Sequence, residues 1–133
     1  MKIRRFILGR DEAEWVEVQN ATYGVRPDYG AFTVEEFRSV EKWPEFDSEG
    51  MFIAELDDQP VGIVHAYVDK LREEKMGFAI RLGVVPEFRG RGIEEKLAET
   101  AIKELRNRGM KVVQSYVSGE PEEVIRMWKN MGF

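Results

Sequence analysis

The sequence predicts one mixed α/β domain, in which a central, mostly antiparallel β-sheet is flanked by helices. Strand-like and helix-like segments follow one another in the order β-α-α-β-β-β-α-β-α. Two of the strands are separated only by the turn at residues 57–60, which implies an antiparallel hairpin. The strand 76–85, a helix and the strand 112–117 imply a right-handed parallel crossover. The length of 133 residues suits a single domain, 1–133.

The composition excludes several classes of site. Hydrophobic residues make up 43% of the chain, enough for a core, and a net charge of −5 argues against nucleic acid as a partner. There is no cysteine and only one histidine, so neither a thiol nucleophile nor a cysteine- or histidine-rich metal site is expected. No signal peptide or long apolar span is evident. We therefore expect a cytoplasmic protein without a metal and without a membrane partner.

The chain is expected to begin with a strand and a helix. Residues 3–8 are β-prone and stop at Gly9, which breaks the segment. Asp11 and Glu14 form a D-x-x-E capping pattern, and apolar residues recur behind it at helical spacing. A helix is therefore predicted over about 12–22.

A loop then leads to a second helix that is rich in aromatic residues. Thr33 and Glu36 form another capping box, and the apolar stripe continues to Trp43. The aromatic side chains of the loop and helix can be core residues, since each buries a large area, or the wall of an acceptor-substrate pocket. These aromatic residues are Tyr23, Tyr29, Phe32, Phe37 and Trp43.

The rest of the chain continues with strands and two helices. A run of charged residues at 69–75 is expected to be a solvated turn between two strands. The predicted elements are strands 51–56, 61–68 and 76–85, a helix from Ile93 to Gly109, a strand 112–117 and a last helix from Pro121 to Gly132.

A glycine-rich turn precedes the helix that starts at Ile93. The first amides of a helix lack partners and lie at the positive end of its dipole. Gly90 and Gly92 let this backbone approach an anion, and Arg89 and Arg91 add positive charge. The spacing fits neither a dinucleotide fingerprint nor a Walker loop. The turn therefore predicts a site for a phosphate-bearing ligand of another kind.

The strand and turn together resemble motif A of the GNAT N-acetyltransferase superfamily. In that family a strand ending V-x-P is followed by Q/R-x-x-G-x-G/A at the start of a long helix. Here the corresponding residues are 84–86 and 89–94, and the tail 128–133 resembles the family's Y-x-K-x-G-F ending. The resemblance implies the GNAT acyl-CoA N-acyltransferase fold and transfer of an acetyl group from acetyl-CoA to an amine of a small molecule or peptide.

The resemblance also implies which residues bind acetyl-CoA. The backbone of residues 82–84 would line the pantetheine and thioester. Its amides would polarise the thioester carbonyl as an oxyanion hole does. Residues 90–95 would hold the pyrophosphate, with Arg89 and Arg91 as its charge partners. The predicted binding residues are Leu82, Gly83, Val84, Arg89, Gly90, Arg91, Gly92, Ile93, Glu94 and Glu95.

Three residues depart from the family pattern. Glu94 replaces a glycine or alanine, and its carboxylate would repel a pyrophosphate unless it points away. Trp128 stands where many members have a tyrosine that protonates the thiolate, and Pro121 where many have an asparagine that binds pantetheine. These departures favour an alternative, a non-catalytic, degenerate domain that serves as the binding half of a larger protein.

The general base and general acid stay unassigned. His65 titrates in the useful range, and Glu55 is a second possible base. Tyr67 and Tyr116 are possible acids. For each of them a structural role in a strand is the competing interpretation.

The chain ends at Phe133, whereas family members continue with one or two strands that complete the sheet. We therefore expect the final strands to be missing and one sheet edge to be open. A homodimer partner or a second domain, as in tandem-domain members of the family, would complete the sheet.

Overall fold

The structure is a computed structural model that describes residues 1–24, 29–43, 46–69, 74–116 and 120–133. It contains the strands and helices in the order that the sequence predicts. Their bounds are β1 Lys2–Arg5, α1 Glu12–Tyr23, α2 Val34–Val40, β2 Met51–Leu56, β3 Gln59–Val68, β4 Met76–Val84, α3 Ile93–Asn107, β5 Val112–Ser115 and α4 Glu122–Asn130.

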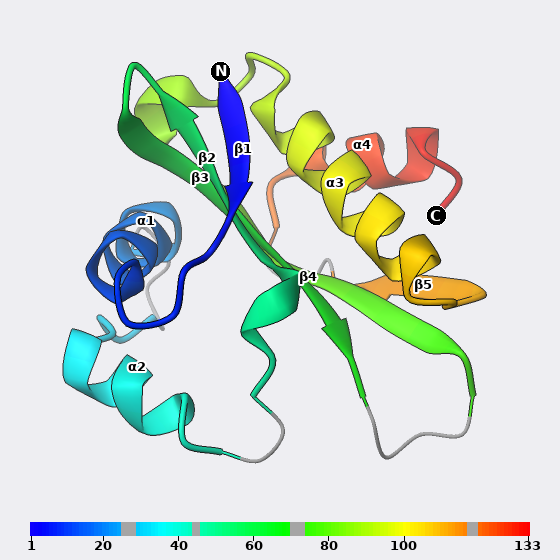
Figure 1. Ribbon diagram of the computed structural model, residues 1–133. Helices are drawn as coiled ribbons and strands as arrows, with labels where there is room; N and C mark the ends of the chain where they lie inside the picture. Colours follow the sequence, from blue (N-terminus) through cyan, green and yellow to red (C-terminus); the bar gives the residue numbers. More distant parts are fainter. Residues whose placement is uncertain (25–28, 44–45, 70–73, 117–119) are drawn as a thin grey trace.

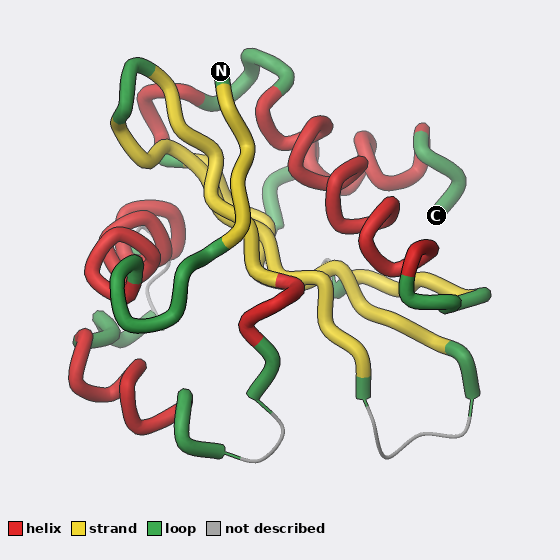
Figure 2. The backbone as a smooth tube through the Cα atoms, in the orientation of Figure 1, coloured by secondary structure: helices red, strands yellow, loops and turns green. Residues whose placement is uncertain are grey.

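The strands form one five-stranded sheet in the order β1-β2-β3-β4-β5. The pairs β1–β2, β2–β3 and β3–β4 are antiparallel, and β4–β5 is parallel. This confirms the predicted hairpin and the predicted parallel pairing of the strands before and after α3. The fold is thus a mixed, mostly antiparallel α/β sheet with helices on both sides (Figures 1 and 2).

Each face of the sheet has its own apolar core. Helices α1 and α2 cover one face, where Trp15 and Phe37 pack on Ile53 and Ile63 of the sheet. Helices α3 and α4 cover the other face, and Trp128 of α4 is buried there. Burial of these side chains is the main force that holds the helices on the sheet.

The first strand is shorter than predicted. The amides of Arg10 and Asp11 both bond the Ile7 carbonyl, so the chain already turns at Ile7, which is 44% exposed. The predicted side-chain cap at Asp11 is wrong, since Asp11 lies at the N-cap position without a capping hydrogen bond. Its carboxylate instead accepts hydrogen bonds from Arg4 and from the Ile7 amide.

The capping box of the second helix is confirmed. The Thr33 hydroxyl accepts a hydrogen bond from the Glu36 amide, and the Glu36 carboxylate accepts one from the Thr33 amide. Helix α2 ends at Val40, three residues earlier than predicted. Most of the predicted charged turn 69–75 and residue 117 of the predicted last strand lie outside the described residues.

The strand β5 lies at one edge of the sheet as described. Val112 at its start is 48% exposed. No helix in the described part of the chain combines the length and apolar character that a membrane span requires.

Candidate functional site

The strand β4 changes its pairing partners along its length. Residues 76–79 pair with β5, whereas residues 80–84 have a described strand neighbour only on the β3 side. Within this stretch the pairing with β3 shifts register, and Arg81 adopts a left-handed φ of 53°. For a residue other than glycine, the left-handed conformation is about 1–2 kcal/mol less favourable than the right-handed one. The bulge therefore stores backbone strain in the part of β4 that does not pair with β5.

A cleft of about 370 Å³ lies beside the separated part of β4. Its lining comes from the end of α1, from β4, from the glycine turn and from the start of α4. It includes six of the ten predicted acetyl-CoA residues. These are Leu82, Gly83, Val84, Arg89, Gly90 and Glu94.

The other four predicted residues lie outside this lining. Ile93 is 4% exposed and its side chain belongs to the core, so only its amide can contact a ligand. Gly92 is the N-cap of α3, and Arg91 and Glu95 are exposed. Their assignment to a ligand stays a prediction.

The glycine turn has the conformation that glycine permits. Gly90 and Gly92 have φ of 77° and 83°, and no atom lies within 4 Å of a Cβ built on either one. The Lys96 amide bonds the Gly92 carbonyl, so the three amides that precede Lys96 in α3 have no acceptor within the helix. This arrangement of open backbone and free amides suits a phosphate group.

The two arginines of the turn differ in their surroundings. Nε of Arg89 donates a hydrogen bond to the Val84 carbonyl, and one terminal nitrogen donates a hydrogen bond to the Thr22 carbonyl. Both hydrogen bonds are 3.0 Å long. Arg89 thus joins the turn to β4 and to the end of α1. The Arg91 guanidinium lies 5.0 Å from the centre of the Phe88 ring. Arg91 is therefore the more available of the two for an anion at the turn.

Glu94 is among the residues that line the cleft. Glu120, which precedes α4, and Glu123 in the first turn of α4 also line it. A carboxylate among the residues that would hold a pyrophosphate opposes the charge of that group. The backbone donors of the turn therefore fit acetyl-CoA, whereas Glu94 weakens the fit.

The Tyr23 side chain reaches the cleft from the end of α1. Its hydroxyl donates a hydrogen bond of 3.1 Å to the Leu82 carbonyl oxygen. Gly83, the next residue, packs against Thr22 so closely that an added Cβ would lie 2.4 Å from the Thr22 Cγ2. The end of α1 is thereby held against the bulged part of β4.

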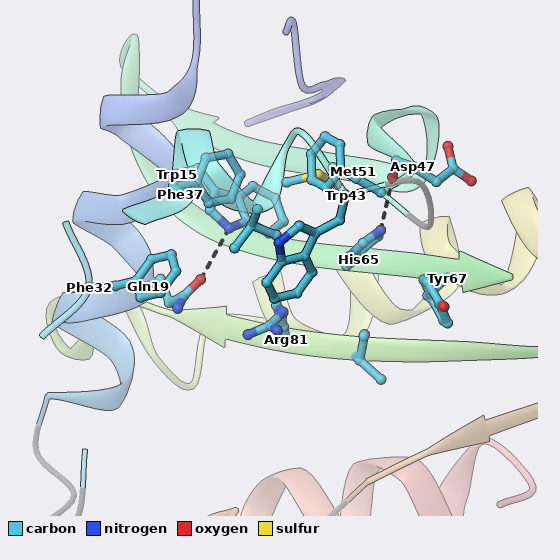
Figure 3. A pocket seen from close by; sticks show the side chains of 13 residues that line it. Trp15, Gln19, Phe32, Phe37, Trp43, Asp47, Met51, His65, Tyr67 and Arg81 are labelled. Atoms are coloured by element: carbon cyan, nitrogen blue, oxygen red, sulfur yellow. Dashed lines mark hydrogen bonds between the residues drawn. The ribbon is translucent and has the colours of Figure 1, made fainter. Parts of the chain in front are cut away.

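A second pocket, of about 400 Å³, opens on the α1–α2 side of the sheet (Figure 3). Figure 3 shows aromatic side chains of α1 and α2 on one side of it and His65 and Tyr67 of β3 on another. Of the five aromatic residues predicted as core or acceptor wall, three line this pocket, and Tyr23 lines the cleft. The aromatic lining consists of Trp15, Phe32, Phe37, Trp43, Phe46, His65 and Tyr67.

His65 does not have the properties of a general base. Burial lowers the pKa of its imidazole to about 4, so the ring is neutral at pH 7. Its Nε2 lies 3.1 Å from the Asp47 carbonyl oxygen, which can only accept, so Nε2 donates. His65 therefore ties β3 to the segment that precedes β2.

The remaining candidates from the sequence lie elsewhere. Glu55 pairs with Arg4 at 2.5 Å, and it lines neither the cleft nor the aromatic pocket. Tyr116 is 68% exposed and stacks on Phe78. Trp128 is 2% exposed in the core and does not line the cleft. Among the described residues, no cluster of three or more acidic or histidine side chains is suited to a metal.

Two residues of the site were missed from the sequence. The sequence predicts Tyr23 as a core residue or as part of an acceptor wall, not as a proton donor, and it does not single out Arg81. A signal existed for Tyr23, because it lies at the end of a helix that precedes a glycine-containing loop. For Arg81 the bulge that positions it depends on pairing between β3 and β4, which no local pattern reveals.

A model of the acetyltransferase (GNAT) family matches residues 13–133, nearly the whole chain. The chain belongs to the GNAT acetyltransferase family. The predicted family and fold class are thereby confirmed.

The curated relatives of this GNAT domain include mycothiol acetyltransferases. The protein from Thermomonospora curvata is 32% identical over 131 residues, which cover 98% of this chain and 43% of the relative. The protein from Stackebrandtia nassauensis is 34% identical over 133 residues, which cover 98% of this chain and 44% of the relative. The GNAT domain described here thus spans less than half the length of these relatives.

Solved structures share the fold at low sequence identity. The ribosomal-protein-S18-alanine N-acetyltransferase from Escherichia coli has a TM-score of 0.74 and 14% identity, over 98% of this chain and 76% of that one. An aminoglycoside N-acetyltransferase solved in complex with CoA has a TM-score of 0.72 and 20% identity, over 99% and 86% of the two chains. These similarities concern the GNAT fold alone.

Proposed function

We propose that this GNAT domain transfers an acetyl group from acetyl-CoA to a primary amine of a small molecule or peptide. The observation that carries the proposal is the position of the cleft. It runs along β4 where β5 has separated, and it includes the glycine turn at the start of α3. Membership of an acetyltransferase family supports the same activity. A cytoplasmic location is part of the proposal.

Different segments of the cleft would bind different parts of acetyl-CoA. The amides of residues 93–95 and the open backbone at Gly90 and Gly92 would hold the pyrophosphate. The backbone of residues 82–84 would bind the pantetheine and thioester. When bound, acetyl-CoA supplies the thioester whose acyl carbon the amine attacks.

Tyr23 is the residue that we assign to proton transfer in the cleft. Its hydroxyl already lies beside Leu82, where the thioester is expected, and Trp128 cannot supply a proton from the core. The amine forms a bond to the acyl carbon and the carbon–sulfur bond breaks. The Tyr23 hydroxyl then gives its proton to the departing thiolate. Tyr23 recovers the proton that the amine loses.

The aromatic pocket and the cleft adjoin each other along two elements. On α1, Gln19 lines the pocket and Thr22 lines the cleft. On β4, Arg81 lines the pocket and Leu82 lines the cleft. An acceptor in the aromatic pocket would therefore present its amine to the part of β4 that faces the thioester.

The proposal is tested by thiol release from acetyl-CoA with a panel of amines, together with a thermal shift. Ligand at one hundred times its dissociation constant stabilises the folded state by about 2.7 kcal/mol. Gly90→Leu should abolish both effects, since it fills the cleft. Gly109→Leu is the matched control, because Gly109 has a similar φ of 85° and lies at the other end of α3.

The outcomes separate the two functions that the sequence left open. If Gly90→Leu abolishes thiol release and Gly109→Leu retains it, the result supports acetyltransferase activity. Acetyl-CoA binding without thiol release from any amine supports a non-catalytic binding domain. If the domain neither binds acetyl-CoA at millimolar concentration nor releases thiol from it, the proposed function is excluded.

A further inference from the structure

The guanidinium of Arg81 is directed into the aromatic pocket by the bulge in β4. Neighbouring residues of a regular strand point to opposite faces of the sheet. Ile80 and Arg81 are neighbours, yet both line the aromatic pocket. Figure 3 shows Arg81 among the lining side chains. The register shift between the pairs Ile63–Gly83 and His65–Ile80, with the left-handed φ of Arg81, produces this change of direction.

Arg81 is the ionisable side chain of this pocket that lacks a counter-ion among the described residues. Apart from the Tyr67 phenol, the lining contains two other ionisable groups, Asp47 and His65. The Asp47 carboxylate pairs with Arg108 at 2.5 Å and accepts a hydrogen bond from the Glu49 amide. His65 is neutral, since burial lowers its pKa to about 4. The pocket therefore presents a net positive charge.

The walls around Arg81 are apolar. Trp15 and Phe37 are 1% and 5% exposed, and their rings lie 6.5 Å apart. Val40, Met51 and Ile80 add aliphatic surface. A pocket of about 400 Å³ with such walls has the size and character of a small-molecule site.

We propose that this pocket binds an aromatic α-amino acid as the acceptor, with its carboxylate on Arg81 and its ring against the aromatic walls. A guanidinium binds a carboxylate through two parallel hydrogen bonds. The amine and carboxylate of an α-amino acid share one carbon. A carboxylate at Arg81 therefore brings the amine near Leu82, the next residue of β4, which lines the cleft.

The same charges exclude other acceptor classes. An acceptor with several ammonium groups requires unpaired carboxylates, and the lining offers only Asp47, which Arg108 already neutralises. The N-terminal residue of a peptide has an amine but no free carboxylate for Arg81. This inference rests on the proposed function, since it names the acceptor of that reaction.

The first experiment measures binding without acetyl-CoA. The fluorescence of Trp15 and Trp43, which line the pocket, reports titration with phenylalanine, 2-phenylethylamine and 3-phenylpropionate. Phenylethylamine has the ring and amine, whereas phenylpropionate has the ring and carboxylate. We expect phenylalanine and phenylpropionate to bind at least tenfold more tightly than phenylethylamine. Equal or tighter binding of phenylethylamine would overturn the proposal.

Variants of Arg81 test the residue itself. Arg81→Asn removes the charge, and asparagine tolerates the left-handed φ. We expect it to abolish the preference for phenylalanine over phenylethylamine, and Arg81→Lys to restore part of that preference. A preference that persists in Arg81→Asn would exclude a carboxylate contact. The comparison of ligands on the unchanged chain stands even where a variant fails to fold.

Thiol release distinguishes failure of this inference from failure of the proposed function. Arg81-dependent binding of phenylalanine without thiol release from any amine contradicts acetyl transfer but leaves the ligand class standing. Thiol release from amines in general, with no effect of Arg81→Asn on KM for phenylalanine, contradicts the ligand class but leaves acetyl transfer standing.

Discussion

The Tyr23 hydroxyl donates a hydrogen bond of 3.1 Å to the Leu82 carbonyl, and it thereby lies at the position proposed for the thioester. Tyr23→Phe removes this proton donor and leaves the ring in place. General acid catalysis contributes about 10²–10⁴ to a rate, so we expect kcat to fall about 100-fold with little change in acetyl-CoA binding. Steady-state thiol release with a binding titration measures both quantities.

Tyr29→Phe is the matched control for this experiment. The Tyr29 ring lies 6.1 Å from that of Tyr23, but its hydroxyl donates to the Asn20 amide oxygen and does not line the cleft. We expect kcat to be unchanged. An equal loss in both variants would mean that packing at the end of α1, and not proton transfer, causes the effect.

Glu94 is predicted to weaken acetyl-CoA binding, because it is a charged residue that lines the cleft. Glu94→Gln removes the charge and keeps the shape. A unit charge near an anion is worth about 1 kcal/mol in a watery site, so we expect binding to tighten about fivefold. The effect should decrease in high salt, since ions screen this repulsion. Calorimetric titration at two salt concentrations measures it.

Glu95→Gln provides the comparison for Glu94→Gln. Both residues lie in the first turn of α3, so both variants lose the same interaction with the helix dipole. Glu95 is exposed and does not line the cleft, and its variant should bind acetyl-CoA as the unchanged chain does. Tightening in both variants would point to the general charge of the turn and not to Glu94.

Local patterns were sufficient to predict the elements and the glycine turn. The turn combines a strand, two glycines and a helix start within a few residues, and both glycines have the left-handed conformation that the pattern requires. The capping box at Thr33 is local in the same sense and is confirmed. Such features need no knowledge of distant partners.

Features that depend on distant partners could not be predicted. Asp11 fits a capping pattern, but Arg4 of β1 binds its carboxylate and removes it from the helix end. Arg89 fits an anion site, but it donates to the Thr22 carbonyl, 67 residues away along the chain. The direction of Arg81 depends on register between two strands. In each case a tertiary contact decides the role of the residue.

Gly83 is predicted to be essential for the packing of α1 on β4. A Cβ at this position would lie 2.4 Å from Thr22 Cγ2, so Gly83→Ala must displace the helix end. We expect a loss of about 1–3 kcal/mol in the free energy of unfolding. Thr22→Gly in the same chain removes the clash and should recover part of the loss. Urea unfolding of the two single variants and the double variant measures the coupling, and additive effects would exclude the contact.

The carboxyl groups of Glu12 in α1 and Glu41, the residue that follows α2, lie close enough to influence each other's pKa. Burial and the neighbouring Glu12 raise the pKa of Glu41 from 4.5 to about 7. A raised pKa means that the folded state holds a proton that the unfolded state has lost. Stability from this group is therefore present below pH 4.5 and is lost as the pH rises to about 7.

Glu41→Gln should remove this loss, because a glutamine amide donates to Glu12 at any pH. We expect the variant to match the unchanged chain near pH 5 and to exceed it by about 1–2 kcal/mol at pH 8. Burial raises the pKa of Glu12, but hydrogen bonds from Glu41 and from backbone amides outweigh burial and lower that pKa, which offsets part of the gain. Urea unfolding at both pH values measures the difference. If the two proteins differ equally at pH 5 and pH 8, the pair does not share a proton.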